Sequence, residues 1–447
     1  MKLLRPRFPL LPLAAGLVVA LVAPAHAEDL LQLYESARAY DATWQSAKAQ
    51  YDANLFRAEQ AKAGILPSAN LGGGVTRSNF DNRTQGLPPL DRNFTTQSAT
   101  VSASQPLYRP ANLATYEQGK RQVELAQAQL AAAGQDLIIR VSQAYFDVLA
   151  AQDTLAFVRA QKTAVNEQLA FAKRNFEVGT STITDTREAQ ARYDLVTAQE
   201  IAAENDLRVK KLALDALVGK PDVQPNPLAL PLSVPEPQPA DVNAWVQQGE
   251  ANSPQVQQAR TAVEIAQLET EKAKAGHKPT LDLTASYGVT RNPNGNATVA
   301  ANTRSDTGTV GVLFNLPLFA GFATQNRIRE TLSLEEKAQA DLEATRRTIA
   351  QAVRSAYFGL VSGQGQVKAL EAAEASSQSA LEANRLGYQV GVRINIDVLN
   401  SQSQLFQTKR DLAQARYNVL LGQLKLRQAN GTLTPEDLTR LNALVAR

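Results

Sequence analysis

The residues best placed to do chemistry are two aspartates, Asp185 and Asp397, each of which closely follows a Val-Gly pair. The pairs are Val178-Gly179 and Val390-Gly391, and both features recur at one offset (397 − 185 and 391 − 179 both give 212). Carboxylates gathered in a narrow space attract multivalent cations. For either copy alone, a coiled-coil hairpin with no further role is the simpler interpretation. An acid at the same place in both copies favours a functional role.

These aspartates must be positioned by helices, because each Val-Gly pair ends a long segment rich in Ala, Gln and Leu. A glycine just past a helix suits a left-handed C-terminal cap, since it has no side chain to clash. Thr182 or Asn395 then stands where a new helix can begin. The sequence therefore predicts two helical hairpins, with tips at about 178–184 and 390–396.

Enzyme chemistry has little to work with in this chain. There is no cysteine, which excludes disulfides, thiol catalysis and thiolate metal sites. After residue 27 the only histidine is His277, next to Pro279, where a structural role is expected. Neither a Gly-x-Ser-x-Gly elbow nor a phosphate-binding loop is present. We expect a protein that is not an enzyme and that has no cofactor and no metal site.

Residues 1–27 are typical of a secretory signal peptide. Lys2, Arg5 and Arg7 precede an apolar run, and Ala25-His26-Ala27 is a small-x-small cleavage site. Without them, 46 − 3 = 43 basic residues face 43 acidic ones, so the mature chain is formally neutral. A neutral chain gives no electrostatic reason to expect a nucleic acid partner.

The 212-residue offset extends over most of the chain. AKAG occurs at 61–64 and again at 273–276. The sequence thus predicts two repeats, 28–219 and 240–447, and such repeats are best recognised before any fold is assigned. Between them, 220–239 contains seven prolines and is predicted to be an extended linker without helix or strand.

Each repeat is expected to contain one shorter helix and one long helical hairpin. The predicted helices are 29–65, 112–177, 183–217, 323–389 and 395–429. The segment 112–177 has no proline and would extend about 100 Å at ~1.5 Å per residue, which implies a coiled coil or bundle. Gly359, Gly363 and Gly365 fall inside 323–389 and argue against a straight helix there.

Between these helices the pattern changes to strict alternation. The predicted strands are 281–290 and 307–319 in the second repeat and 68–78 and 95–107 in the first. About ten residues is the length of a tilted membrane strand. Four strands cannot close a barrel, so two chains would have to supply eight strands or three chains twelve. The alternative is a small soluble sheet that caps a helical bundle.

With its duplication, its tip YQVGVRINIDVLNSQSQL and its ending GTLTPEDLTRLN at 431–442, the mature chain resembles the TolC family of outer-membrane channel-tunnels. The resemblance implies an all-α coiled-coil tunnel joined to a transmembrane β-barrel, built by a homotrimer with twelve strands. It also implies that the protein lies in the outer membrane, contacts its lipid and extends into the periplasm. A periplasmic adaptor, coupled to an inner-membrane transporter, would dock at the Val-Gly tips.

The same resemblance assigns roles to individual residues. Four residues match those that latch the entrance of such channels: Thr184, Asp185, Tyr388 and Arg393. Asp397 matches the first of two acidic rings. The second ring falls on Asn400, so one ring of carboxylates is missing from this chain.

The predicted function is therefore an outer-membrane exit duct of a tripartite efflux or type I secretion system. Drugs, peptides and proteins are all possible cargo for such a duct. The competing hypothesis is a periplasmic coiled-coil adaptor or scaffold without a membrane barrel.

Overall fold

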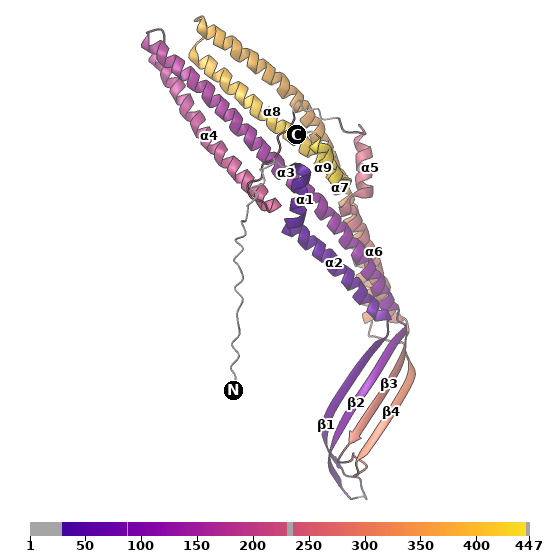
Figure 1. Ribbon diagram of the computed structural model, residues 1–447. Coiled ribbons are helices and arrows are strands. Elements are labelled where there is room, and N and C mark those ends of the chain that lie inside the picture. Colours follow the sequence, from indigo (N-terminus) through magenta and orange to yellow (C-terminus); the bar gives the residue numbers. More distant parts are fainter. Residues whose placement is uncertain (1–28, 87, 230–235, 444–447) are drawn as a thin grey trace, which may run out of the picture.

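The computed structural model describes residues 29–86, 88–229 and 236–443. The expected signal peptide lies outside these residues. Long helices gather at one end of the molecule and a four-stranded sheet extends from the other (Figure 1). Between the two, shorter helices surround the middle of the bundle.

The elements follow one another as two similar units. The first consists of α1 (Leu30–Tyr40), α2 (Ala42–Lys62), β1 (Ser68–Asn82), β2 (Leu90–Tyr108), α3 (Pro110–Glu177) and α4 (Ile183–Val218). The second consists of α5 (Val242–Asn252), α6 (Pro254–Lys274), β3 (Thr280–Asn292), β4 (Thr303–Asn315), α7 (Ala323–Gln389) and α8 (Asn395–Ala429). Helix α9 (Pro435–Asn442) follows, and short 3₁₀ turns, η1 (Ala63–Ile65) and η2 (Ala275–His277), precede β1 and β3.

The four long helices begin and end within two residues of the predicted positions. Helix α7 continues through Gly359, Gly363 and Gly365. Within the described residues, no helix has a stretch both long and apolar enough to cross a membrane.

The segment predicted to be helical at 29–65 is helical, but Asp41 divides it into α1 and α2, and it ends in the 3₁₀ turn η1. The Asp41 side chain accepts a hydrogen bond from the Trp44 N–H at 2.7 Å and so caps the start of α2. Ser253, at the same place in the second repeat, separates α5 from α6 just before Pro254. A capping residue and a proline at one repeat position both interrupt helix at that point.

The strand boundaries also differ from the prediction. Strands β1 and β2 are longer than 68–78 and 95–107, because polar residues beyond the alternating runs still pair, as far as Asn82 with Leu90. Strand β3 extends the predicted 281–290 at both ends. Strand β4 begins before 307 and ends at Asn315, not at 319, since Pro317 cannot donate to a strand ladder.

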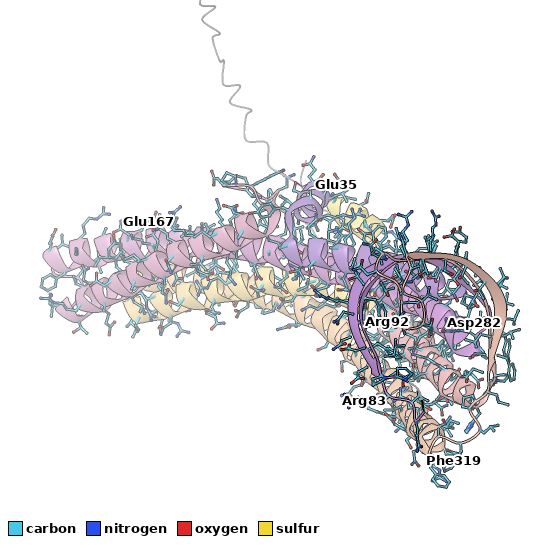
Figure 2. All side chains as sticks on the ribbon, turned by 90° about the horizontal axis from the view of Figure 1, so that it is seen from below. Glu35, Arg83, Arg92, Glu167, Asp282 and Phe319 are labelled. Atoms are coloured by element: carbon cyan, nitrogen blue, oxygen red, sulfur yellow. The ribbon has the colours of Figure 1, made fainter. Side chains whose placement is uncertain are left out.

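The sheet has the order β1-β2-β3-β4 with every neighbour antiparallel, so β1 and β4 are its two edges. The register places Leu71 beside Val101, Val101 beside Tyr287 and Leu283 beside Val312, all on one face. Seen along the sheet in Figure 2, the strands form an arc, and the labelled Arg92 and Asp282 lie within it.

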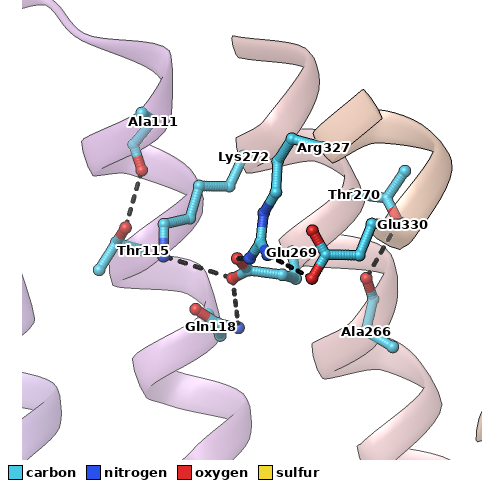
Figure 3. Close-up of polar contacts among 9 residues, drawn as sticks. All are labelled: Ala111, Thr115, Gln118, Ala266, Glu269, Thr270, Lys272, Arg327 and Glu330. Atoms are coloured by element: carbon cyan, nitrogen blue, oxygen red, sulfur yellow. Dashed lines mark hydrogen bonds and ion pairs between the residues drawn. The ribbon is translucent and has the colours of Figure 1, made fainter. Parts of the chain in front are cut away.

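Side-chain contacts fix the sheet to the helices. Arg109, between β2 and α3, forms a two-pronged ion pair with the buried Asp282 of β3 at 2.8 and 2.7 Å. Near this junction Glu269 of α6 accepts hydrogen bonds from Arg327 of α7 at 2.7 Å and from Gln118 of α3 at 3.3 Å (Figure 3). Three helices are thus held in one arrangement above the strands.

The main hydrophobic core lies at the middle of the bundle and joins the two repeats. Tyr145 of α3 is fully buried there, among side chains from α1, α4, α8 and α9. Its hydroxyl donates to the carbonyl of Asn226 at 2.8 Å. The matching residue of the second repeat, Tyr357, donates to the carbonyl of Ala240. A duplicated tyrosine therefore anchors each side of the interrepeat linker.

Candidate entrance at the hairpin tips

The first helix of each hairpin ends in the same backbone structure. Gly179 has φ 78° and Gly391 has φ 80°, the left-handed conformation that the sequence predicts for these positions. In each tip an N–H beyond the glycine donates to a carbonyl five residues back. These bonds are Thr180 to Asn175 at 2.8 Å and Val392 to Gly387 at 2.9 Å. Because no other atom comes near a Cβ at either glycine, backbone conformation alone requires glycine there.

Apolar side chains are exposed around both turns. Val178 is 73% exposed and Val390 is 66% exposed, although valine is usually buried. Ile183, Val392 and Ile394 are also exposed. The two tips therefore present an apolar surface at the end of the molecule farthest from the sheet (Figure 1).

Asp185 is engaged in its own turn. Its carboxylate accepts hydrogen bonds from the Ser181 hydroxyl at 2.6 Å and the Thr182 hydroxyl at 3.1 Å, and Thr182 caps α4 in return. Thr184 is exposed at the start of the same helix. Asp185 thus stabilises the first tip, a role that its spacing from Thr182 already signals as a capping box.

The second tip uses its acid differently. Arg393 forms an ion pair with Asp397, one helical turn farther on, at 3.6 Å. The Arg393 stem lies against Gly387, where an added Cβ would come within 2.7 Å of it. Helix α8 has no side-chain cap. Asp397 in the first turn of α8 still favours the helix, since a negative charge suits the N-terminal end of its dipole.

Asn395 connects the two tips. It is fully buried, and its amide donates to the main-chain carbonyl of Asp185 at 3.1 Å. Its side-chain oxygen accepts from Gln168 of α3 at 2.6 Å. The amide side chain is satisfied on both of its polar ends by the other hairpin. The sequence pattern does not reveal this role, because it marks Asn395 only as a possible helix start.

Within the described residues, the Tyr388 side chain forms no hydrogen bond with the predicted latch partners. Its ring packs edge-on against Phe171 of α3, with centroids 5.7 Å apart. Its hydroxyl is buried and has no hydrogen-bond partner within the described residues. Leaving a buried hydroxyl without a hydrogen bond costs free energy. The Tyr388 hydroxyl would therefore gain from a hydrogen-bond partner.

Asn400 lies one turn beyond Asp397 on α8, and its side-chain oxygen accepts from Arg192 of α4 at 3.0 Å. Of the predicted residues, the structure therefore pairs Arg393 with Asp397 and brings the Asp185 main chain to the second tip. Within the described chain, no hydrogen bond or ion pair joins the Asp185 carboxylate or Thr184 to the side chain of Tyr388 or Arg393. The latch and the acidic ring remain predictions.

Comparison with known proteins follows the duplicated architecture. The model of the outer membrane efflux protein family matches twice, over residues 33–220 and 245–432. The chain belongs to the outer membrane efflux protein family. Among relatives, outer membrane protein TolC of Vibrio cholerae is 33% identical over 435 residues, covering 97% of this chain and 98% of that protein. Alkaline protease secretion protein AprF of Pseudomonas aeruginosa is 32% identical over 93% of this chain and 86% of its own length.

Solved structures share the fold. The outer membrane protein VceC of Vibrio cholerae superposes with a TM-score of 0.78 at 20% identity, covering 90% of this chain and 96% of that one. The CmeC outer membrane channel of Campylobacter jejuni gives 0.76 at 15% identity, covering 93% and 89%. These findings confirm the predicted family, the tunnel fold, the outer-membrane location and the function as an exit duct. The family is one of transport proteins.

Proposed function

We propose that three copies of this chain form one continuous duct, which spans the outer membrane with twelve strands and crosses the periplasm with its helices. The proposal rests above all on the one-sided sheet. Large apolar side chains on one face of the sheet are exposed in the chain: Leu71, Val75, Val101, Leu283, Tyr287, Val310, Val312 and Phe314. The opposite face is mostly polar or small, with Leu313 as an exposed exception. A surface of this kind fits lipid on one side and water on the other.

The sheet edges require further copies. Strands β1 and β4 each leave one row of backbone groups without a partner strand. Backbone groups unpaired in lipid cost several kcal/mol each. Pairing β4 of one copy with β1 of the next satisfies both edges. Three copies give twelve strands and a wider lumen than two copies would.

The helical part also needs neighbours. Helix α4 exposes Ile201, Val209 and Leu212, and α7 exposes Phe358 and Val361. Such apolar stripes on long helices are typical of contacts between packed helices. In the trimer they are expected to lie between copies. The alternative of a periplasmic adaptor without a barrel leaves both the sheet face and its edges unexplained.

The apolar tips are proposed as the docking surface for a periplasmic adaptor that is coupled to an inner-membrane transporter. Val178-Gly179 and Val390-Gly391 would form its contact residues, because the valine side chains are exposed and the glycines hold the turns in the left-handed conformation. Tyr388, Arg393, Thr184 and Asp185 would hold the entrance closed between copies. Asp397 would form the acidic ring.

Assembly state tests this proposal. The mature chain, purified from outer membranes in detergent, is expected to have the mass of a trimer by light scattering. Unheated samples should migrate faster or slower on gels than boiled ones, as closed β-barrels do. A stable monomer that osmotic shock releases from cells would refute the proposed trimer and its twelve-stranded barrel.

A further inference from the structure

A groove runs between α4 and α8 just behind the tips. It is positively charged, although the sequence predicts an acidic ring at Asp397 near this end of the duct. It has a volume of about 430 Å³. Arg192 of α4 and Arg410 of α8 both line it, and Gln161 of α3 forms part of it as a buried side chain. None of the described residues that line the groove is acidic.

Both arginines use neutral partners. Arg192 donates to Asn400 at 3.0 Å. Arg410 donates to Gln161 at 3.2 Å and to Gln407 at 2.7 Å. Within the part of the chain that the structure describes, neither arginine forms an ion pair. Two positive charges therefore stand in one groove, and their hydrogen-bond acceptors there are all side-chain amide oxygens.

Arg410 is the more constrained of the two. Burial lowers its pKa, and the charge of neighbouring Asp411 acts in the opposite direction. The Asp411 carboxylate itself accepts a hydrogen bond from the Gln407 amide at 2.7 Å. Even a lowered arginine pKa leaves the guanidinium charged near neutral pH. A half-buried cation that forms no direct ion pair gains from any anion that can reach it.

The spacing of the partners indicates the size of such an anion. Asn400 and Gln407 mark the two guanidinium positions and lie seven residues apart on α8, or about 10 Å at ~1.5 Å rise per residue. Planar guanidinium groups bind the oxygens of phosphates and carboxylates in pairs. An anion with two or more such groups can contact both arginines at once.

We propose that the α4–α8 groove is an oxyanion-binding site that takes phosphate or carboxylate groups. In the proposed trimer, on which this placement rests, Asn400 faces the channel axis and the groove opens to the lumen. Three grooves then surround the passage just inside the entrance. Asp397 is already paired with Arg393 and so offsets little of the charge of the two groove arginines. We therefore expect Arg192 and Arg410 to attract acidic groups of cargo to this part of the duct.

Binding to the purified trimer tests the site directly. Inorganic tripolyphosphate and the tricarboxylate citrate are titrated into the detergent-solubilised protein by calorimetry. We expect both to bind, and Arg192→Gln or Arg410→Gln to weaken binding about tenfold each, the effect of losing one charge-assisted contact. Binding of tripolyphosphate alone would support the site and identify phosphate as the group recognised.

A third variant keeps both arginines, so it tests the site even if the arginine variants fail to fold. Gln404→Glu places a carboxylate in the groove, where it should occupy the arginines and weaken binding by a similar factor. Gln414→Glu adds the same charge to the same helix outside the groove, and Arg208→Gln removes an exposed arginine of α4; neither should change binding. Absence of binding, or equal effects of groove and control variants, would overturn the site.

Single-channel recording separates this proposal from the duct itself. Wild-type channels in planar bilayers should be blocked by tripolyphosphate from the periplasmic side, and Gln404→Glu channels should resist the block. Channels that form but are never blocked would refute the groove and leave the duct intact. A protein that binds tripolyphosphate through Arg192 and Arg410 yet forms no channels would refute the duct and leave the groove.

Discussion

The side chain of Asn395, at the start of α8, donates a hydrogen bond to the main-chain carbonyl of Asp185, in the first turn of α4. The two residues are 210 positions apart in the sequence, and this bond joins the tips of the two hairpins. Because the acceptor belongs to the main chain, the link is independent of what the Asp185 carboxylate does. The carboxylate is thus available to stabilise its own turn while the tips stay connected.

Asn395→Ala should loosen the tips. The change leaves the Gln168 amide without its 2.6 Å partner and the Asp185 carbonyl without its extra donor, and such losses in buried sites cost about 1–3 kcal/mol. Hydrogen exchange at main-chain amides in residues 175–190 should become faster, while that in the central core stays the same. The matched control is Asn384→Ala, because Asn384 bonds to Ser401 within a single hairpin. Equal exchange in both variants would contradict the role given to Asn395.

Features of this fold that depend on neighbouring residues could be predicted from the sequence, and contacts between the two hairpins could not. Gly179 and Gly391 mark the helix ends because a left-handed cap is a property of the local backbone. The face of the sheet follows from alternation, which is equally local. Asn395 and Arg192 act through residues of the other hairpin, so no local pattern reveals them. Asp41 lies between these cases, because its cap is local but its neighbours are good helix formers.

The stability of the fold at low pH depends on the ion pair between Asp41 and Arg140. Arg140 of α3 donates two hydrogen bonds to the Asp41 carboxylate, at 2.8 and 3.0 Å. These bonds lower the pKa of Asp41, although burial acts against them. A carboxyl with a lowered pKa stabilises the fold above its unfolded value of about 3.9 and loses that contribution as the pH falls through the folded pKa. The wild-type contribution is therefore present at neutral pH and disappears only in acid.

Arg140→Gln should move acid unfolding to higher pH. Without the guanidinium, burial still raises the pKa of Asp41 and the backbone hydrogen bonds from Trp44 and Thr43 still lower it, so the pKa rises from its wild-type value and protonation begins at higher pH. At pH 7 the loss should be about 2–3 kcal/mol, less than the 3–5 kcal/mol of a fully buried pair because Arg140 is partly exposed. Helical circular dichroism between pH 2 and pH 6 measures the midpoint. Arg347→Gln, which breaks an exposed pair with Glu343, should leave that midpoint unchanged.

Tyr388→Phe distinguishes a role of the hydroxyl in closing the entrance from a role in the stability of the fold. Among the residues that the structure describes, the Tyr388 hydroxyl has no hydrogen-bond partner, so its removal should not reduce stability and should leave the packing on Phe171 intact. If the hydroxyl bonds across copies in the closed trimer, Tyr388→Phe combined with Arg393→Ser should raise single-channel conductance. Charge-assisted bonds of this type are worth about 1.5–3 kcal/mol each. Unchanged conductance at unchanged stability would place the closing contacts elsewhere.

Arg192 changes what is expected from restoring the missing acidic ring. Asn400→Asp alone would place a carboxylate where Arg192 already donates at 3.0 Å, and the two charges would largely cancel. Block of single channels by a trivalent cation such as hexamminecobalt(III) should therefore strengthen little. Asn400→Asp together with Arg192→Gln leaves three uncompensated carboxylates in the trimer and should lower the blocking constant about tenfold or more.

Asp397→Asn should abolish the modest wild-type block, and Asn418→Asp, on the same helix away from the ring, should have little effect. Equal block in the single and double variants would show that Arg192 does not neutralise position 400.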